Sequence, residues 1–223
     1  MYCKIFFQNK ALIVSKDRDK ILYLNSKQNL EESSDNFGII EISSGKVYFT
    51  PLVFCLIRAK KPYKENGKLS YNKLFMEKKK LKEEIQIGGI NLKITRLENY
   101  NLQFYLYQRR NQNGEVIRND ISFTNSNIKQ FQNPVLLGSE TGLFPGQIPE
   151  AEGNISKKHC YLGYDFDKNL FYVVDYGTIG EGSSNGTFVV LTKNTLEISD
   201  ECAFIVYNYE NVQFPFTIFP SLD

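Results

Sequence analysis

Two short polar segments hold the residues of this 223-residue chain that are best suited to chemistry. The first reads Asn-Ile-Ser-Lys-Lys-His-Cys at 154–160 and contains His159, the only histidine. The second reads Gly-Ser-Ser-Asn-Gly-Thr-Phe at 182–188. Together they offer hydroxyls, ammonium groups and an amide, which suit a doubly charged ligand rich in oxygen, such as a phosphate monoester.

The surrounding pattern predicts strands that position both segments. Each segment is a turn of small polar residues leading into alternating apolar residues, and residues 170–174 supply a strand between them. Two adjacent loops would then present Ser156, Lys157, Ser184 and Asn185 at one end of a sheet.

The order of three motifs resembles the forkhead-associated (FHA) family, whose pattern reads Gly-Arg, then Ser-x-x-His, then Ser/Thr-x-Asn-Gly-Thr. The matching segments here are Gly138-Ser139, Ser156-Lys157-Lys158-His159 and Ser184-Asn185-Gly186-Thr187. The spacing is 18 residues from Gly138 to Ser156 and 29 from Ser156 to Asn185, which is compatible with the family. The resemblance covers roughly residues 100–219.

The resemblance implies an antiparallel β-sandwich that recognises phosphothreonine in a protein partner and is not a catalyst. The residues implied to bind the phosphopeptide are Ser139, Ser156, Lys157, Ser184 and, through the peptide main chain, Asn185. The residues implied to support the loops are Gly138, His159, Gly186 and Thr187.

One position departs from the family pattern, because Ser139 stands where the arginine is expected. Losing a charge-assisted contact of that kind costs about 1.5–3 kcal/mol, or about tenfold or more in affinity. Residues 131–223 also carry 4 Lys/Arg against 12 Asp/Glu, which repels an anionic peptide at long range. Two functions therefore stay open: a phosphothreonine-binding module, or a degenerate FHA scaffold that is a structural subunit of a large assembly through phosphate-independent contacts.

The sequence argues against an enzyme. It lacks a Gly-x-x-x-x-Gly-Lys-Ser/Thr nucleotide cradle, and the glycines at 177–182 lack Rossmann spacing. His159 and Cys160 are neighbours on one predicted strand, so they point to opposite faces and cannot pair as base and nucleophile. The carboxylates Asp165, Asp167 and Asp175 fall on hairpins, where solvated turn roles are expected. We expect no catalytic residue and no cofactor.

The four cysteines lie far apart and form no Cys-x-x-Cys, so neither a metal site nor a disulfide framework is expected. Reduced, buried thiols in an intracellular protein are the better interpretation. The longest early apolar stretch, 11–14, is too short for an export signal, and no run approaches a membrane span. We expect a nuclear, cytosolic, cytoskeletal or ciliary protein with a protein partner and no membrane contact.

Residues 58–84 are basic, with ten Lys/Arg and four Asp/Glu. This charge raises nucleic-acid binding as an alternative, but no stacking motif of an RNA-binding fold accompanies it, and a solvated surface is favoured. Within this segment, Tyr71, Leu74 and Phe75 predict one face of a helix beginning after Ser70.

Residues 1–98 predict a β-rich region, with strands at 4–7, 11–14, 21–24, 38–42, 46–49 and 53–58. Residues 99–223 form the predicted FHA-like domain, closed by strands between 196 and 219. The N-terminal region is either a plain extension or a diverged second FHA-like sandwich. In the second case the expected alignment places Cys55 at Cys160, Pro51 at Ser156 and Phe54 at His159.

Overall fold

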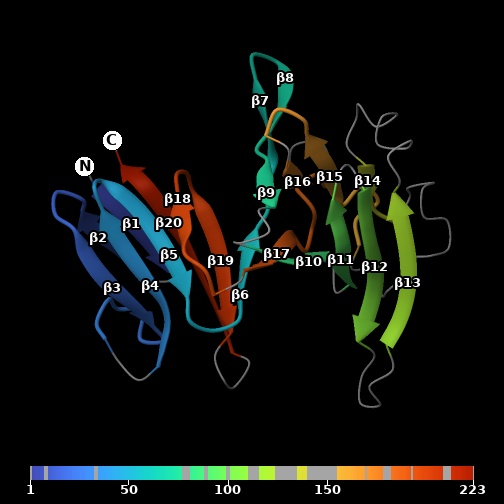
Figure 1. Cartoon of the computed structure of the whole chain (residues 1–223). Coiled ribbons are helices and arrows are strands. Elements are labelled where there is room, and N and C mark those ends of the chain that lie inside the picture. Colours follow the sequence, from blue (N-terminus) through green and yellow to red (C-terminus); the bar gives the residue numbers. More distant parts are fainter. Residues whose placement is uncertain are drawn as a thin grey trace. The chain divides into compact units, whose positions relative to one another are not determined.

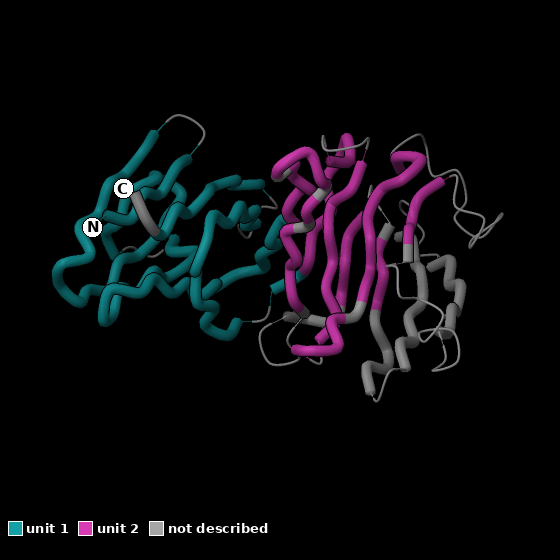
Figure 2. The backbone as a smooth tube through the Cα atoms, turned by 90° about the horizontal axis from the view of Figure 1, so that it is seen from above, with its two compact units in different colours: residues 1–58, 190–223 teal, residues 59–189 magenta. Residues whose placement is uncertain are grey.

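The structure is a computed structural model in which every described element is a β-strand or a turn. It describes residues 2–7, 10–32, 35–76, 81–87, 90–98, 101–109, 116–123, 135–139, 155–168, 170–177, 182–191, 193–207 and 212–222. The chain divides into two compact units, which Figure 2 colours separately. Unit 1 comprises Met1–Arg58 and Val190–Asp223, and unit 2 comprises Ala59–Val189.

Unit 1 consists of two antiparallel sheets. Its strands are β1 (Tyr2–Phe7), β2 (Lys10–Ser15), β3 (Lys20–Asn25), β4 (Asn36–Ser43), β5 (Lys46–Pro51), β6 (Cys55–Arg58), β18 (Leu196–Ile198), β19 (Cys202–Tyr207) and β20 (Gln213–Leu222). The strand order is β2-β1-β20-β19-β6 in one sheet and β3-β4-β5-β18 in the other. The C-terminal strands therefore pair with N-terminal ones, as the red β20 beside the blue β1 shows in Figure 1.

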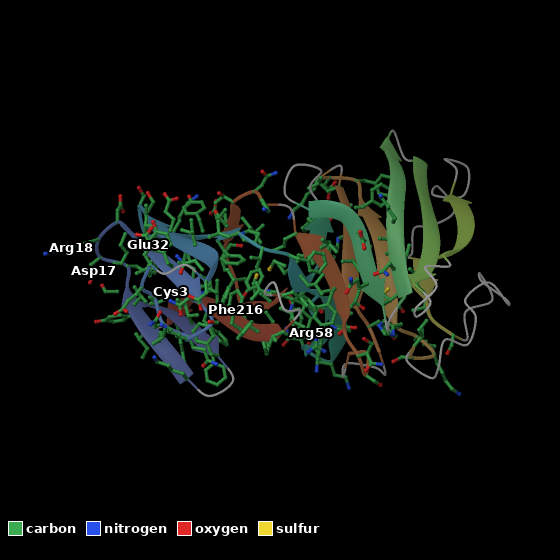
Figure 3. All side chains as sticks on the ribbon, turned by 90° about the horizontal axis from the view of Figure 1, so that it is seen from below. Cys3, Asp17, Arg18, Glu32, Arg58 and Phe216 are labelled. Carbon is green, nitrogen blue, oxygen red and sulfur yellow. The ribbon has the colours of Figure 1, made fainter. Side chains whose placement is uncertain are left out.

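Phenylalanine side chains join the two sheets of unit 1. Phe49 of β5 contacts Phe204 of β19 and Phe216 of β20, with ring centroids 4.8 and 5.5 Å apart. Phe37 of β4 also packs against Phe216, at 5.9 Å. In Figure 3, Phe216 and Cys3 lie among the interior side chains of this unit. Burying each ring contributes about 1.5–3 kcal/mol, so this cluster is the core of a β-sandwich.

Unit 2 repeats this architecture with other strands. They are β9 (Leu74–Met76), β10 (Leu81–Ile87), β11 (Ile90–Glu98), β12 (Asn101–Arg109), β13 (Val116–Phe123), β14 (Val135–Leu137), β15 (Cys160–Asp165), β16 (Leu170–Asp175) and β17 (Thr187–Leu191), of which β17 begins in unit 2. The orders are β13-β12-β11-β10-β17 and β14-β15-β16-β9. A separate hairpin consists of β7 (Pro62–Glu65) and β8 (Lys68–Tyr71).

Buried aliphatic side chains come from both sheets of unit 2. Ile85 of β10 and Leu92 of β11 are buried in the first sheet, and Leu162 of β15 is buried in the second. Strand β16 is buried without a break from Phe171 to Asp175. A strand covered on both faces shows such a continuous run instead of an alternation.

The all-β fold and the six N-terminal strands confirm the sequence prediction. The helix predicted after Ser70 is wrong within the described residues, because Leu74–Met76 is strand β9, paired with β16. Residues 77–80 lie outside the described part. Leu74 and Phe75 form too short an apolar run to distinguish a helix from a strand.

The predicted boundary between 98 and 99 is not the boundary between the compact units. Strands β18, β19 and β20 complete unit 1, through pairs with β5, β6 and β1. Strands β10 and β11 join unit 2 instead, where β11 pairs with β12. The reason is that strand pairing is not local, and an apolar alternation identifies the buried face of a strand but not its partner.

Candidate functional site

Two loops of unit 2 meet at the ends of β14, β15, β16 and β17. The first loop closes where the N–H of Ser139 donates to the Ser156 carbonyl at 3.2 Å and the N–H of His159 donates to Leu137 at 2.8 Å. Residues 140–154 between these positions lie outside the described part. The second loop returns to β17 through residues 182–186.

The His159 side chain holds the two loops together. The ring is fully buried, at 0% exposure. Its Nδ1 accepts the N–H of Ser156 at 3.2 Å, and its Nε2 lies 3.1 Å from the Gly186 carbonyl oxygen. Since Nδ1 is an acceptor here, the proton sits on Nε2 and is donated to Gly186, which assigns the neutral ring.

Burial lowers the pKa of His159 from its ordinary value, against the raising effects of the Gly186 carbonyl and the Asp175 charge. The hydrogen bonds and the lowered pKa therefore agree on a neutral histidine near pH 7. This bridging position fits the supporting role expected for His159 and leaves neither ring nitrogen directed to act as a catalytic base.

Asp175 is a second buried support, and the sequence did not reveal it. Its Oδ1 accepts the Ser183 N–H at 3.1 Å, the Ser183 hydroxyl at 2.5 Å and the Thr187 hydroxyl at 3.0 Å. Asp175 itself is fully buried at the end of β16. The solvated turn role expected for it is therefore wrong, because the carboxylate organises the start and the end of the second loop.

Asp165 behaves as the sequence predicts for a hairpin carboxylate. Its Oδ1 accepts the N–H of Lys168 at 3.1 Å within the turn, and its Oδ2 forms an ion pair with Lys73 at 2.7 Å. Asp167 is exposed on the same turn. These two carboxylates have turn and surface roles, and neither takes part in the support of the loops.

Above the buried supports, the two loops present polar groups toward solvent. Ser139, Lys157, Ser184 and Asn185 are exposed, and Ser156 is half-buried. The loops touch directly here, because the N–H of Ser184 donates to Ser156 Oγ at 3.3 Å. A hydroxyl that accepts one bond can still donate its own hydrogen to a ligand oxygen. We call these five residues the loop cluster.

Two glycines make this close approach possible. A Cβ on Gly138 would lie 2.1 Å from the carbonyl oxygen of Lys157, so no larger residue fits where the first loop closes. Gly186 has φ +75°, a left-handed conformation that side chains disfavour. The supporting roles expected for both glycines are consistent with these positions.

A segment from an earlier part of the chain borders the second loop. The N–H of Ala59 donates to Thr187 at 2.8 Å, and the N–H of Asp175 donates to Lys60 at 3.0 Å. The aliphatic stem of Lys61 lies over Gly182, where a Cβ would come 2.9 Å from Lys61 Cε. Lys61 therefore brings a cation to the second loop, which no motif in the sequence indicated.

Among the residues that the structure describes, the four cysteines form no disulfide, and Cys3, Cys55 and Cys160 are buried. Burial raises the pKa of the Cys160 thiol far above its ordinary value, which disfavours a nucleophilic thiolate next to His159. The described residues contain no group of three or more His, Cys, Asp or Glu arranged to hold a metal ion. They also contain no helix long and apolar enough to cross a membrane.

The structure thus brings together all the site residues that the sequence singled out: Gly138, Ser139, Ser156, Lys157, His159, Ser184, Asn185, Gly186 and Thr187. The residues it adds are Asp175, Ser183 and Lys61. No family model, curated protein or solved structure matches the chain.

Proposed function

We propose that the loop cluster of unit 2 recognises a phosphothreonine in a protein partner, without catalysis. The observation that supports this most directly is the Ser184 N–H to Ser156 Oγ hydrogen bond above the buried His159 and Asp175. Rigid supports of this kind hold hydroxyl and N–H donors in place before a ligand arrives, which reduces the entropy lost on binding.

The charges of the loop cluster favour a compact, doubly charged anion. Lys157 is the exposed cation of the cluster, and Lys61 lies over Gly182 of the same loop. A phosphate monoester carries about −1.5 to −2 charges near pH 7 and three acceptor oxygens. Hydroxyls and ammonium groups match such a ligand better than they match a carboxylate or an apolar side chain.

The test is fluorescence anisotropy with a degenerate phosphothreonine peptide library and with the same peptides unphosphorylated. Ser184→Ala removes a donor while keeping the backbone N–H that holds the loops, so we expect affinity to fall about tenfold or more. Ser199→Ala changes an exposed serine outside the loop cluster and is the matched control. Equal affinities for the two variants would contradict the proposal.

Ser139→Arg sharpens the same test, because it adds a planar, permanently charged group at an exposed position of the loop cluster. We expect phosphate-dependent affinity to rise about tenfold or more. Binding that is independent of phosphate in both the natural chain and this variant rejects phosphothreonine recognition.

A structural subunit of a large assembly is the second candidate. It is favoured by the serine at position 139 and by the excess of acidic residues over 131–223. In that case a partner stays bound through phosphatase treatment and high salt. A partner that phosphatase treatment releases supports phosphothreonine recognition instead.

A further inference from the structure

We infer that the chain is an internal duplication whose two copies exchange their last three strands. Copy 1 comprises β1–β6 and β9–β11, and copy 2 comprises β12–β20. The hairpin β7–β8 is an insertion in copy 1. Strands β1–β6 are completed by β18–β20 of copy 2, and strands β12–β17 are completed by β9–β11 of copy 1.

The strand orders of the two units carry this inference. We number the strands of each copy in chain order, without the β7–β8 hairpin. Strands with the same number then occupy the same place in unit 1 and in unit 2. The order β2-β1-β20-β19-β6 matches β13-β12-β11-β10-β17, and the order β3-β4-β5-β18 matches β14-β15-β16-β9. In both units the first six strands come from one copy and the last three come from the other.

The pairing registers of the four-stranded sheets agree residue by residue. In unit 1, Gly38 pairs with Leu24 on one side and with Pro51 on the other. In unit 2, Cys160 stands between Leu137 and Asp175 in the same way. The exchanged strands also pair at equivalent positions. Leu196 pairs with Phe49, two residues before Pro51, and Leu74 pairs with Val173, two residues before Asp175.

Two irregular features recur at equivalent places. The residue after the fifth strand donates its N–H to the carbonyl of the residue just before Gly38 or its counterpart Cys160: Leu52 to Phe37 in unit 1, and Tyr176 to His159 in unit 2, both at 3.0 Å. In addition, the ladder between the last and first strands is shifted by one residue in both units, in β20–β1 and in β11–β12. Such coincidences follow from common descent of the copies more readily than from independent folding.

The chain also changes units at equivalent places. It leaves unit 1 at Arg58, the end of the sixth strand of copy 1, and leaves unit 2 at Val189, within the sixth strand of copy 2. The connection between the copies gives a physical reason. Only residues 99 and 100 separate β11 from β12, and Glu98 pairs with Asn101. Because so short a connection favours a hairpin, β11 is held beside copy 2 and is unavailable to its own copy.

The exchange has a consequence for the loop cluster. Its loops belong to copy 2, whereas β9, which pairs with β16, and the segment 59–61, which borders the second loop, belong to copy 1. Neither copy therefore builds the complete surroundings of the loop cluster from its own strands.

Disulfide trapping in the full chain tests the exchange. Tyr48 faces Glu197, and its counterpart Tyr172 faces Phe75. In a Cys202→Ser background, Tyr48→Cys with Glu197→Cys should form an intramolecular disulfide, because directly opposed residues of antiparallel strands are close enough. Unexchanged copies would instead place Tyr48 opposite Phe75, so Tyr48→Cys with Phe75→Cys is the matched control and should stay reduced.

The reciprocal pair, Tyr172→Cys with Phe75→Cys, repeats the test in unit 2 should the first pair disturb folding. Mass spectrometry and non-reducing size exclusion identify the linked residues and the number of chains. A disulfide between positions 48 and 75 would overturn the exchange. A disulfide between position 48 of one chain and position 197 of another would mean that the strands are exchanged between two chains and not within one.

Cleavage of the folded chain gives an independent readout. A protease site inserted between Asn99 and Tyr100 separates the copies along the chain. We expect the two fragments to elute together as one particle until denaturant is added, since each supplies strands to both units. Fragments that separate without denaturant and keep their β-sheet circular dichroism overturn the exchange.

Discussion

Unit 1 and unit 2 have the same strand order, but side chains of different chemistry occupy the equivalent positions next to their loops. In unit 2, His159 joins two loops through hydrogen bonds from its ring. Phe37 occupies that position in unit 1, where it is 2% exposed and packs on Phe214 and Phe216. The residue that aligns with Asp175 is Pro51, which offers no hydrogen-bond acceptor on its side chain.

Loop length follows the same division. Three residues, 52–54, connect β5 to β6, whereas eleven residues, 176–186, connect β16 to β17. The shorter connection, Leu52-Val53-Phe54, contains no hydroxyl or amide side chain of the kind that Ser183-Ser184-Asn185 supplies in unit 2. Its exposed side chains include Leu52 and Phe54 instead. The common scaffold therefore carries a candidate site only in the unit where buried polar groups support a long loop.

The largest expected effect is on the aromatic core of unit 1. Phe216→Ala removes a buried ring that contacts Phe37, Phe49 and Phe204, and should lower the free energy of unfolding by about 3–5 kcal/mol. Urea denaturation followed by circular dichroism measures this. Phe166→Ala, at an exposed phenylalanine, is the control and should change stability little. Similar losses for both variants would mean that unit 1 does not depend on its aromatic cluster.

Asp175→Ala removes the buried carboxylate that supports the second loop of unit 2. It should lower the free energy of unfolding by a smaller amount, about 2–3 kcal/mol. The change leaves the donors of Ser183 and Thr187 without their carboxylate acceptor in a buried place. The same urea titration measures the loss, and the exposed Asp167→Ala is the control. Stability equal to that of the natural chain would show that the loops of unit 2 do not need Asp175.

The pH dependence of stability distinguishes the units next, because unit 2 holds the only histidine. Burial lowers the pKa of His159 below its ordinary 6.5, so the unfolded chain takes up the proton first as the pH falls. The contribution of the neutral ring is therefore present above about pH 6.5 and is lost below it.

Urea unfolding at about pH 7.5 and about pH 5.5, where most carboxylates stay ionised, detects this loss. His159→Phe introduces the residue that unit 1 has at the aligned position, and it should remove most of the pH dependence in this window. A variant that keeps the full dependence would assign the dependence to groups other than the histidine.

The sequence predicted the strands and the meeting of the two loops, for identifiable reasons. Alternating apolar residues in β1, such as Cys3, Ile5 and Phe7, indicate a strand with one buried face, and the structure buries all three. The Ser156 and Ser184 loops come together because hairpin connections link β15 to β16 and place their ends side by side. These are local relationships, which short motifs can encode.

Local patterns of this kind do not predict the exchanged strands or the role of Asp175. Nothing in the alternation of 203–206 states whether β19 pairs with β6 or with β17, since both partners are apolar. In the inferred duplication, Gly38 and not Cys55 is the counterpart of Cys160, because the pairing registers of the strands set the alignment. From the sequence, Asp175 resembles a solvated turn residue. In the structure, Ser183 and Thr187, eight and twelve positions later, donate hydrogen bonds to its carboxylate.

The smallest expected effect concerns Lys61, which copy 1 contributes beside the second loop of unit 2. Its ammonium group is on a flexible, exposed side chain, so its contribution to binding a phosphothreonine peptide is screened by solvent and salt. Lys61→Ala should weaken binding by about two- to fivefold at physiological salt and by less at high salt. Lys193→Ala, at an exposed lysine after β17, is the control and should bind as the natural chain does. Anisotropy titrations at two salt concentrations measure the difference. Equal affinities for the two variants at low salt would mean that Lys61 does not contribute, and that the cations that bind phosphate come from copy 2 alone.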